Sequence, residues 1–174
     1  MSDVASPKCS REETQVHSTK NDLPESKRSQ VAVILNDRLA DAIHLGLQTK
    51  QAHWNVKGPN FIALHELFDA IYAIVQGQGD EIAERITAFG GVAEGTLAAV
   101  EARSHLPAYP IDVVHGRDHV AALSSSLALF GKAVRADIDR TAALGDAGTA
   151  DLLTGVSREI DKQLWFLEAH LQGE

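Results

Sequence analysis

The sequence lacks several features that would place it in particular protein classes. Cys9 is its only cysteine, which excludes a disulfide framework and a thiolate-rich metal site. No uninterrupted apolar stretch approaches the ~20 residues that span a bilayer, and the N-terminus has no apolar signal-peptide core. We therefore expect no membrane partner, and we expect the cytoplasm to be the compartment.

An excess of positive charge is also absent, since the formal net charge is −8. The basic and acidic residues of the first thirty positions cancel: Lys8, Arg11, Lys20, Lys27 and Arg28 stand against Asp3, Glu12, Glu13, Asp22 and Glu25. The negative charge therefore lies on the rest of the chain. This distribution argues against simple electrostatic attraction to DNA or anionic membranes, and an acidic body suits a protein that attracts cations.

No segment alternates like a β-strand, and neither an internal repeat nor a Gly-rich phosphate loop is present. Residues 1–29 are polar and contain Pro7 and Pro24, so we predict a flexible N-terminal tail followed by one domain at 30–174. Helical spacing of apolar residues continues through most of that domain. It predicts long helices over roughly 30–56, 59–90, 114–144 and 149–171, with a short helix within 92–112.

These elements predict an all-α fold, an antiparallel four-helix bundle with one long crossover between the second and third long helices. The glycines in QGQGD leave one alternative open. Because each glycine inside a helix costs about 1 kcal/mol relative to alanine, a break at Gly77–Gly79 would divide the second helix.

Five side chains of metal-binding type lie close together in the sequence: His53, His65, Asp69, Asp80 and Glu84. The spacing of four within the His65–Asp69 and Asp80–Glu84 pairs puts each pair on one helical face, one turn apart. Taken singly, a histidine or an acidic residue on a helix is usually a surface contact or a salt-bridge partner. The acidic residues beside Arg85, for example, could pair with that arginine. Together, the five side chains indicate a metal site without thiolate, which suits iron, manganese or zinc.

The spacing of eleven between Asp69 and Asp80 suggests that two subunits share the site. On a continuous helix these residues lie about 16 Å apart, too far to ligate one metal ion. A turn at 57–60 brings His53 to His65, so one chain can supply the histidines and Asp69. Asp80 and Glu84 must then bind either a second metal ion or the same ion from another subunit. In an isologous dimer with antiparallel helices, Asp80 and Glu84 of the second chain would complete the site. A helix break at Gly77–Gly79 would instead permit a site within one chain.

The segments KQAHWNVKGPNFIALHELFD and DEIAERITAFGG resemble the Dps proteins, ferritin-like mini-ferritins of starved bacterial cells. The similarity extends from about Leu35 through IDKQLWFLEAHL. It implies a ferritin-like bundle with a short crossover helix, assembled as a hollow homododecamer. It also implies intersubunit di-iron ferroxidase centres that oxidise Fe(II), preferably with hydrogen peroxide, store ferric mineral and so protect DNA. The family's ligands match all five metal-binding residues.

The resemblance also suggests roles for residues outside the five. Trp54 would donate electrons to leftover oxidant, although a core aromatic at the helix turn is the more ordinary role. Asp146 and Asp151 would line an iron-entry pore, with a helix cap as the alternative for either. His115 and His119 are spaced for an accessory metal site but do not match the family's ligands, so we expect surface or interface histidines.

Two further functions remain open at this stage. A nucleoid-packaging protein would bind DNA directly through its N-terminal arms, but compensating acids in the arm make strong binding unexpected. Twelve arms could still act together, and association with the nucleoid would follow. A structural zinc ion at the dimer interface is the other alternative, because the same ligands suit zinc.

Overall fold

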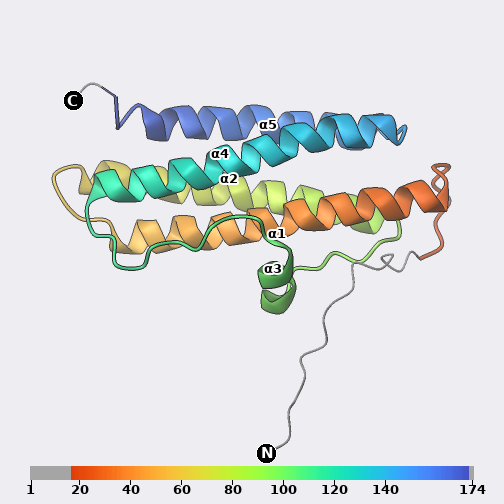
Figure 1. The fold of residues 1–174 in the computed structure, drawn as a ribbon, viewed down its shortest axis with the longest axis horizontal. Helices are drawn as coiled ribbons and strands as arrows, with labels where there is room; N and C mark the ends of the chain where they lie inside the picture. The colour runs from red at the N-terminus through yellow and green to blue at the C-terminus, as the bar shows by residue number, and fades with distance from the viewer. Residues whose placement is uncertain (1–16, 173–174) are drawn as a thin grey trace, which may run out of the picture.

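The computed structural model describes residues 17–172, which fold into helices without a β-strand in that range. Four long helices form the bundle: α1 (Glu25–Asn55), α2 (Phe61–Ala88), α4 (Gly116–Ala143) and α5 (Ala147–Glu168). The short α3 (Leu97–Arg103) lies in the crossover between α2 and α4, packed beside α1 and outside the four-helix layer (Figure 1). The all-α prediction, with a short helix in the crossover, is confirmed.

The core follows the apolar periodicity of the sequence. Its largest fully buried side chains include Phe68 on α2, Phe130 on α4 and Ile160 on α5. Burying each such side chain contributes about 1.5–3 kcal/mol, which supplies the stability that helical propensity alone does not. The pairs α1–α2 and α4–α5 make the most extensive helix contacts, and α1 also packs against α4. The bundle is therefore two antiparallel hairpins joined by the crossover.

The first helix begins at Glu25, five residues before the position expected from the sequence. Pro24 ends the preceding segment, and its carbonyl accepts from the backbone N–H groups of Lys27 and Arg28. Arg28 is buried, and its guanidinium donates to the carbonyls of Leu23 and Phe89. Residues 25–29 thus belong to the bundle, because Arg28 ties the start of α1 to the end of α2.

The second helix is continuous through Gly77 and Gly79, so the alternative of a break there is wrong. Gly79 is buried, and a Cβ atom on it would lie 3.7 Å from the Cβ of Ala42 on α1. Close packing between the two helices holds this stretch in helical form despite its low propensity. The continuity fixes the distance between the two ends of the predicted metal site.

Candidate metal centre

The turn between α1 and α2 brings the two histidines together, as the sequence predicted. Gly58, with φ of 115°, reverses the chain in a conformation that only glycine adopts readily. The imidazole rings of His53 and His65 then stack, with centroids 3.7 Å apart and planes inclined by 23°. Both rings are partly buried.

Each histidine is oriented by the backbone of the other. His53 Nδ1 lies 2.8 Å from the carbonyl oxygen of His65, and His65 Nδ1 lies 2.9 Å from that of His53. Because a carbonyl only accepts, both Nδ1 atoms carry the proton and donate it. In the neutral rings the lone pair is then on Nε2. The reciprocal bonds thus prepare two Nε2 atoms as metal ligands and fix the orientation of both rings.

Asp69 lies one turn beyond His65 on α2, exposed, and forms a salt bridge with Lys50 of α1. The hydrogen bond from Lys50 lowers the pKa of Asp69 below its ordinary value, and the charge of the same ammonium acts in the same direction. Lys50 also lies over the Tyr72 ring, 4.8 Å from its centroid. A metal ion that binds Asp69 must therefore compete with Lys50.

Asp80 and Glu84 are exposed on the far half of α2 and form no ion pair with any described residue. Arg85, the neighbour that could have neutralised them, instead donates to Asp146 and Thr149 at the start of α5. Asp80 is about 16 Å from Asp69 along the continuous helix. Within residues 17–172, one chain gathers no group of three or more metal-binding side chains.

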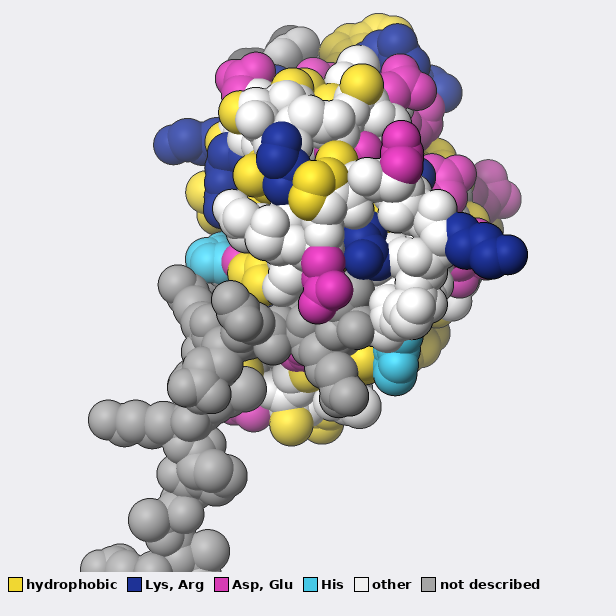
Figure 2. All heavy atoms as spheres, turned by 90° about the vertical axis from the view of Figure 1, so that its right-hand side faces the viewer, with side chains coloured by type: hydrophobic (Ala, Val, Ile, Leu, Met, Phe, Trp, Pro, Cys, Tyr) yellow, Lys and Arg dark blue, Asp and Glu magenta, His cyan; other side chains and the backbone are white. Residues whose placement is uncertain are grey.

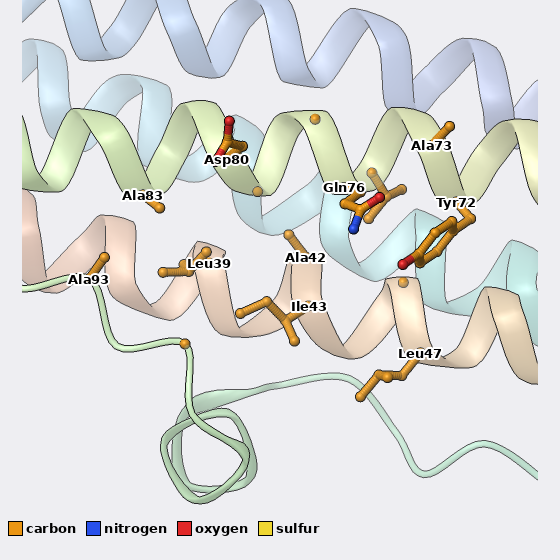
Figure 3. Close-up of a pocket in the computed structure, with 15 residues that line it drawn as sticks. Leu39, Ala42, Ile43, Leu47, Tyr72, Ala73, Gln76, Asp80, Ala83 and Ala93 are labelled. Atoms are coloured by element: carbon orange, nitrogen blue, oxygen red, sulfur yellow. The ribbon is translucent and has the colours of Figure 1, made fainter.

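A groove separates the two ends of the predicted site. We call His53, His65 and Asp69 the histidine end, and Asp80 with Glu84 the carboxylate end. The groove has a volume of about 720 Å³ between α1 and α2, and its walls are mainly small or apolar, including Leu39, Ile43 and Leu47 (Figure 3). Asp80 lies at its margin. Of the two ends, only Asp80 lines the groove. Asp69, Ala73, Gln76 and Asp80 recur every three or four residues along α2, so the two ends share one face of this helix.

The interior of the bundle offers no alternative carboxylate site among the described residues. Its two fully or nearly buried aspartates on facing helices, Asp41 and Asp137, both pair with Arg38. Burial raises the pKa of Asp137, although Arg38 and Arg140 oppose the shift. Elsewhere, the buried polar groups include Gln48, whose amide oxygen accepts from Ser126. The sequence contains no Glu-x-x-His motif, which supplies di-iron ligands inside some four-helix bundles, and the core of this bundle is held by amides and ion pairs instead.

The additional candidates occupy different environments. Trp54 is 68% exposed, so the core-aromatic interpretation is wrong for the single chain. The helix-cap alternative describes Asp146, which is buried as the N-cap of α5 and accepts from the Thr149 amide. Asp151 is exposed on the first turns of α5. Its pore role remains a prediction.

His115 and His119 do not form the helical pair that their spacing predicted. His115 is exposed at the extended N-cap position before α4. His119 is buried at 1% exposure, and its Nδ1 lies 2.6 Å from the Tyr109 hydroxyl. The expectation of a surface or interface histidine is therefore wrong for His119. No local pattern predicts its contact with Tyr109 or the contact of Lys50 with Asp69, because each joins separate elements.

Comparison with known proteins identifies the family to which this architecture belongs. A family model described as a ferritin-like domain matches residues 33–173. The DNA protection during starvation protein of Agrobacterium fabrum is 49% identical over 156 residues, covering 90% of this chain and 96% of that protein.

Solved structures agree with the sequence comparison. A Mycobacterium smegmatis Dps structure superposes with a TM-score of 0.86 at 34% identity, covering 91% of this chain and 96% of that one. A Vibrio cholerae Dps, described as a member of a broad superfamily of ferritin-like diiron-carboxylate proteins, gives a TM-score of 0.82 at 27% identity, covering 86% and 94%. The chain therefore belongs to the Dps family of ferritin-like proteins.

Proposed function

We propose that this protein oxidises Fe(II) at centres shared between two subunits and stores the ferric product. The observation that carries the proposal is the pair of histidines whose Nδ1 atoms are engaged by backbone carbonyls, leaving Nε2 for a metal ion. Asp80 and Glu84 complement them as exposed carboxylates without an ion-pair partner among the described residues. Imidazole and carboxylate together suit iron, and carboxylates favour the ferric state.

In an isologous dimer, the histidine end of one chain would meet the carboxylate end of the other. The groove between α1 and α2 lies between the histidine end and the carboxylate end, and Leu47 on its wall is 54% exposed. A second copy packed antiparallel on this face would cover the apolar wall and bring its own Asp80 and Glu84 to His53 and His65. Two equivalent centres would result. The extension from this dimer to a hollow homododecamer rests on family membership.

The oxidation of Fe(II) by hydrogen peroxide can proceed here without a radical product. Two ferrous ions each give one electron to one hydrogen peroxide molecule, whose O–O bond breaks. With two protons, the products are two ferric ions and two water molecules. The histidines hold the incoming ferrous ions, and the carboxylates stabilise the oxidised ions. The cavity would then receive the ferric product as mineral, and removing Fe(II) together with peroxide would protect DNA without contact.

The relatives support this proposal through their names. The Agrobacterium fabrum protein is named for DNA protection during starvation, and the Vibrio cholerae protein is described as a ferritin-like diiron-carboxylate protein. Trp54 is a candidate electron donor beside the histidine end, since it follows His53 and is exposed. Asp151 is the accessible candidate for an iron-entry pore.

A complementation experiment tests both the chemistry and the shared site. One variant lacks the histidine ligands (His53→Ala/His65→Ala) and the other lacks the carboxylate end (Asp80→Ala/Glu84→Ala). Each alone should lose peroxide-driven Fe(II) oxidation, followed by ferric absorbance after anaerobic loading. When the two are unfolded together and reassembled, each mixed dimer regains one intact centre. We expect partial recovery of the oxidation rate, towards half of the wild-type rate per mixed dimer.

The control removes equal charge elsewhere. Glu81→Ala/Asp139→Ala changes two exposed acidic residues outside the proposed centre and should keep the wild-type rate. If the two ligand variants oxidise iron normally, the five residues are structural and a zinc ion becomes the better assignment. If both are inactive and mixing restores nothing, although mass spectrometry shows mixed dimers, the centre is not shared between subunits.

A further inference from the structure

The crossover segment 104–111 runs beside α1 toward α4 without regular secondary structure (Figure 1). Leu106 is its only buried residue, and Ile111 is 82% exposed. Apolar burial therefore does little to hold this segment in place. Its local stability depends on polar contacts near its two ends, and each of these contacts involves a histidine.

The first contact has a fixed hydrogen-bond direction. The Gln48 Nε2 amide donates to the carbonyl of Pro107 at 2.7 Å and also faces His44 Nε2 at 3.1 Å. The amide cannot be flipped, because the Pro107 carbonyl only accepts and therefore requires the amide N–H group. His44 Nε2 must therefore accept, which requires a neutral imidazole.

The other ring nitrogen of His44 extends this series of hydrogen bonds. Its Nδ1–H donates to the Ser104 hydroxyl at 2.8 Å, and Ser104 donates to the carboxylate of Asp41 at 3.1 Å. Asp41 also accepts from the backbone N–H of His105 at 2.6 Å. A proton added to His44 Nε2 would face the Gln48 N–H group. It would interrupt the series of hydrogen bonds by which α1 holds the crossover.

The second contact is the Tyr109 hydroxyl, which lies 2.6 Å from His119 Nδ1 on α4. In the neutral ring with its proton on Nε2, the Tyr109 hydroxyl donates to Nδ1. Burial raises the pKa of Tyr109, so its proton is retained. His119 Nε2 is buried and meets no described acceptor in full hydrogen-bond geometry, although the Asn55 carbonyl is close enough to favour a proton on the ring. Protonating this histidine would place a charge in a nearly inaccessible site, and the Tyr109 hydroxyl would have to accept from Nδ1 instead of donating to it.

We propose that His44 and His119 form an acid-sensitive latch, which holds the crossover segment 104–111 against α1 and α4 while both imidazoles are neutral. Acidification opens the latch locally and leaves the four-helix bundle folded. This device is independent of iron oxidation, because neither histidine belongs to the metal centre.

The electrostatic environment supports the direction of the effect. Burial lowers the pKa of His44, and the charge of Asp41 opposes the shift without cancelling it. Burial likewise lowers the pKa of His119, against the smaller effects of the Asn55 carbonyl and Asp118. A depressed histidine pKa contributes stability above the unfolded value of about 6.5, and that stability is lost as the pH falls.

Other charged groups face the latch from every neighbouring element. On α1, Arg38 pairs with Asp41 and also contacts His105 Nδ1 at 3.4 Å. Asp137 of α4 holds Arg38 from the opposite side, and Glu101 of α3 lines the same cavity as His44. His105 is itself exposed, and its Nδ1 lies 3.8 Å from a carboxylate oxygen of Asp41.

Opening would change a defined surface. A cavity of about 690 Å³ lies between α1, α3 and the crossover, with His44, Gln48, Ser104 and Tyr109 among its lining residues. These four residues belong to the two latch contacts, whereas His119 does not line the cavity. Release of the crossover would widen this cavity and expose its apolar wall.

Hydrogen–deuterium exchange of the full chain tests the latch, with labelling times scaled for the intrinsic pH dependence of exchange. Between about pH 7.5 and about pH 5.0 we expect at least a tenfold loss of protection in 104–111, since each unit below the unfolded pKa favours the protonated form tenfold. Peptides from the α1–α2 and α4–α5 hairpins should keep their protection.

The variant His44→Gln/His119→Gln cannot be protonated, so protection of 104–111 should be equal at the two pH values, whatever its level. His170→Gln, which removes an exposed histidine after α5, should behave as the wild type. Equal pH-dependent loss in the double variant and the wild type would overturn the proposal. A histidine ¹³C NMR titration of the wild type needs no variant: pKa values of His44 and His119 at or above 6.5 would also overturn it.

Discussion

At the scale of single residues, the metal centre depends on which groups already occupy the ligands. The Nδ1 atoms of His53 and His65 are engaged by backbone carbonyls, which orients the rings and leaves Nε2 available. Asp69 differs, because the ammonium of Lys50 occupies one of its two carboxylate oxygens, Oδ1. Lys50 is therefore expected to weaken the first binding step, even though it does not belong to the ligand set.

Replacing Lys50 with methionine should tighten divalent-metal binding at the histidine end by roughly two- to fivefold, the range typical of an exposed ion pair. The methylene stem can still pack beside Tyr72, while the competing charge is lost. Calorimetry with anaerobic Fe(II) measures the change. Lys57→Met removes the same charge from an exposed position at the turn and serves as the control. Equal tightening in both variants would mean that only the overall charge matters.

At the scale of elements, a glycine within α2 and a glycine just after its end have opposite effects on stability. Gly77 is exposed inside the helix, and a Cβ atom there would meet nothing within 4 Å. Gly90, just past the helix, has φ of 81°, and a Cβ atom there would clash with the carbonyl oxygen of His17. The backbone N–H of His17 also donates to the Gly90 carbonyl, so this glycine permits close contact between the two segments.

Alanine at these positions should therefore change stability in opposite directions. Gly77→Ala should stabilise the protein by about 0.5–1 kcal/mol, since alanine is the better helix former. Gly90→Ala should destabilise it by more than about 1 kcal/mol, because the left-handed backbone disfavours alanine and the His17 carbonyl must move. Denaturant unfolding of the two variants beside the wild type measures both effects. A stabilising Gly90→Ala would show that 17–24 does not pack against the end of α2 in solution.

At the scale of the whole molecule, charge separates iron chemistry from DNA binding. Figure 2 shows the end of the bundle where α1 begins, with acidic and basic side chains intermixed and no extended basic patch among its coloured atoms. The sequence before the described residues adds Lys8 and Arg11 but also Asp3, Glu12 and Glu13. The net charge of −8 therefore opposes nonspecific attraction to phosphate.

Gel shifts over a salt series should show no retardation of duplex DNA near physiological salt, for the full chain or for a chain lacking residues 1–16. A deletion through residue 28 would be a poor comparison, because it removes the first turn of α1 and the buried Arg28. Retardation at physiological salt that disappears with residues 1–16 would favour the nucleoid-packaging alternative. Protection of DNA against Fe(II) and peroxide should occur without any retardation.

Local patterns in the sequence determined the helices and the candidate ligands. Apolar periodicity predicted the four long helices and the crossover helix, because amphipathic spacing depends on neighbours within two turns. The i,i+4 pairs His65–Asp69 and Asp80–Glu84 were predictable for the same reason. The start of α1 was not, since Arg28 resembles a polar tail residue until the carbonyl of Phe89 accepts from it.

Only the tertiary structure decided how the pieces combine. Packing of Gly79 against Ala42 keeps α2 continuous, which separates the two ends of the metal centre and leaves the groove between them. Folding also brings Lys50 to Asp69 and Tyr109 to His119, contacts between elements that no local pattern encodes. The physical reason is the same throughout: helical periodicity is a short-range property, whereas the identity of a side chain's partner depends on which elements pack together.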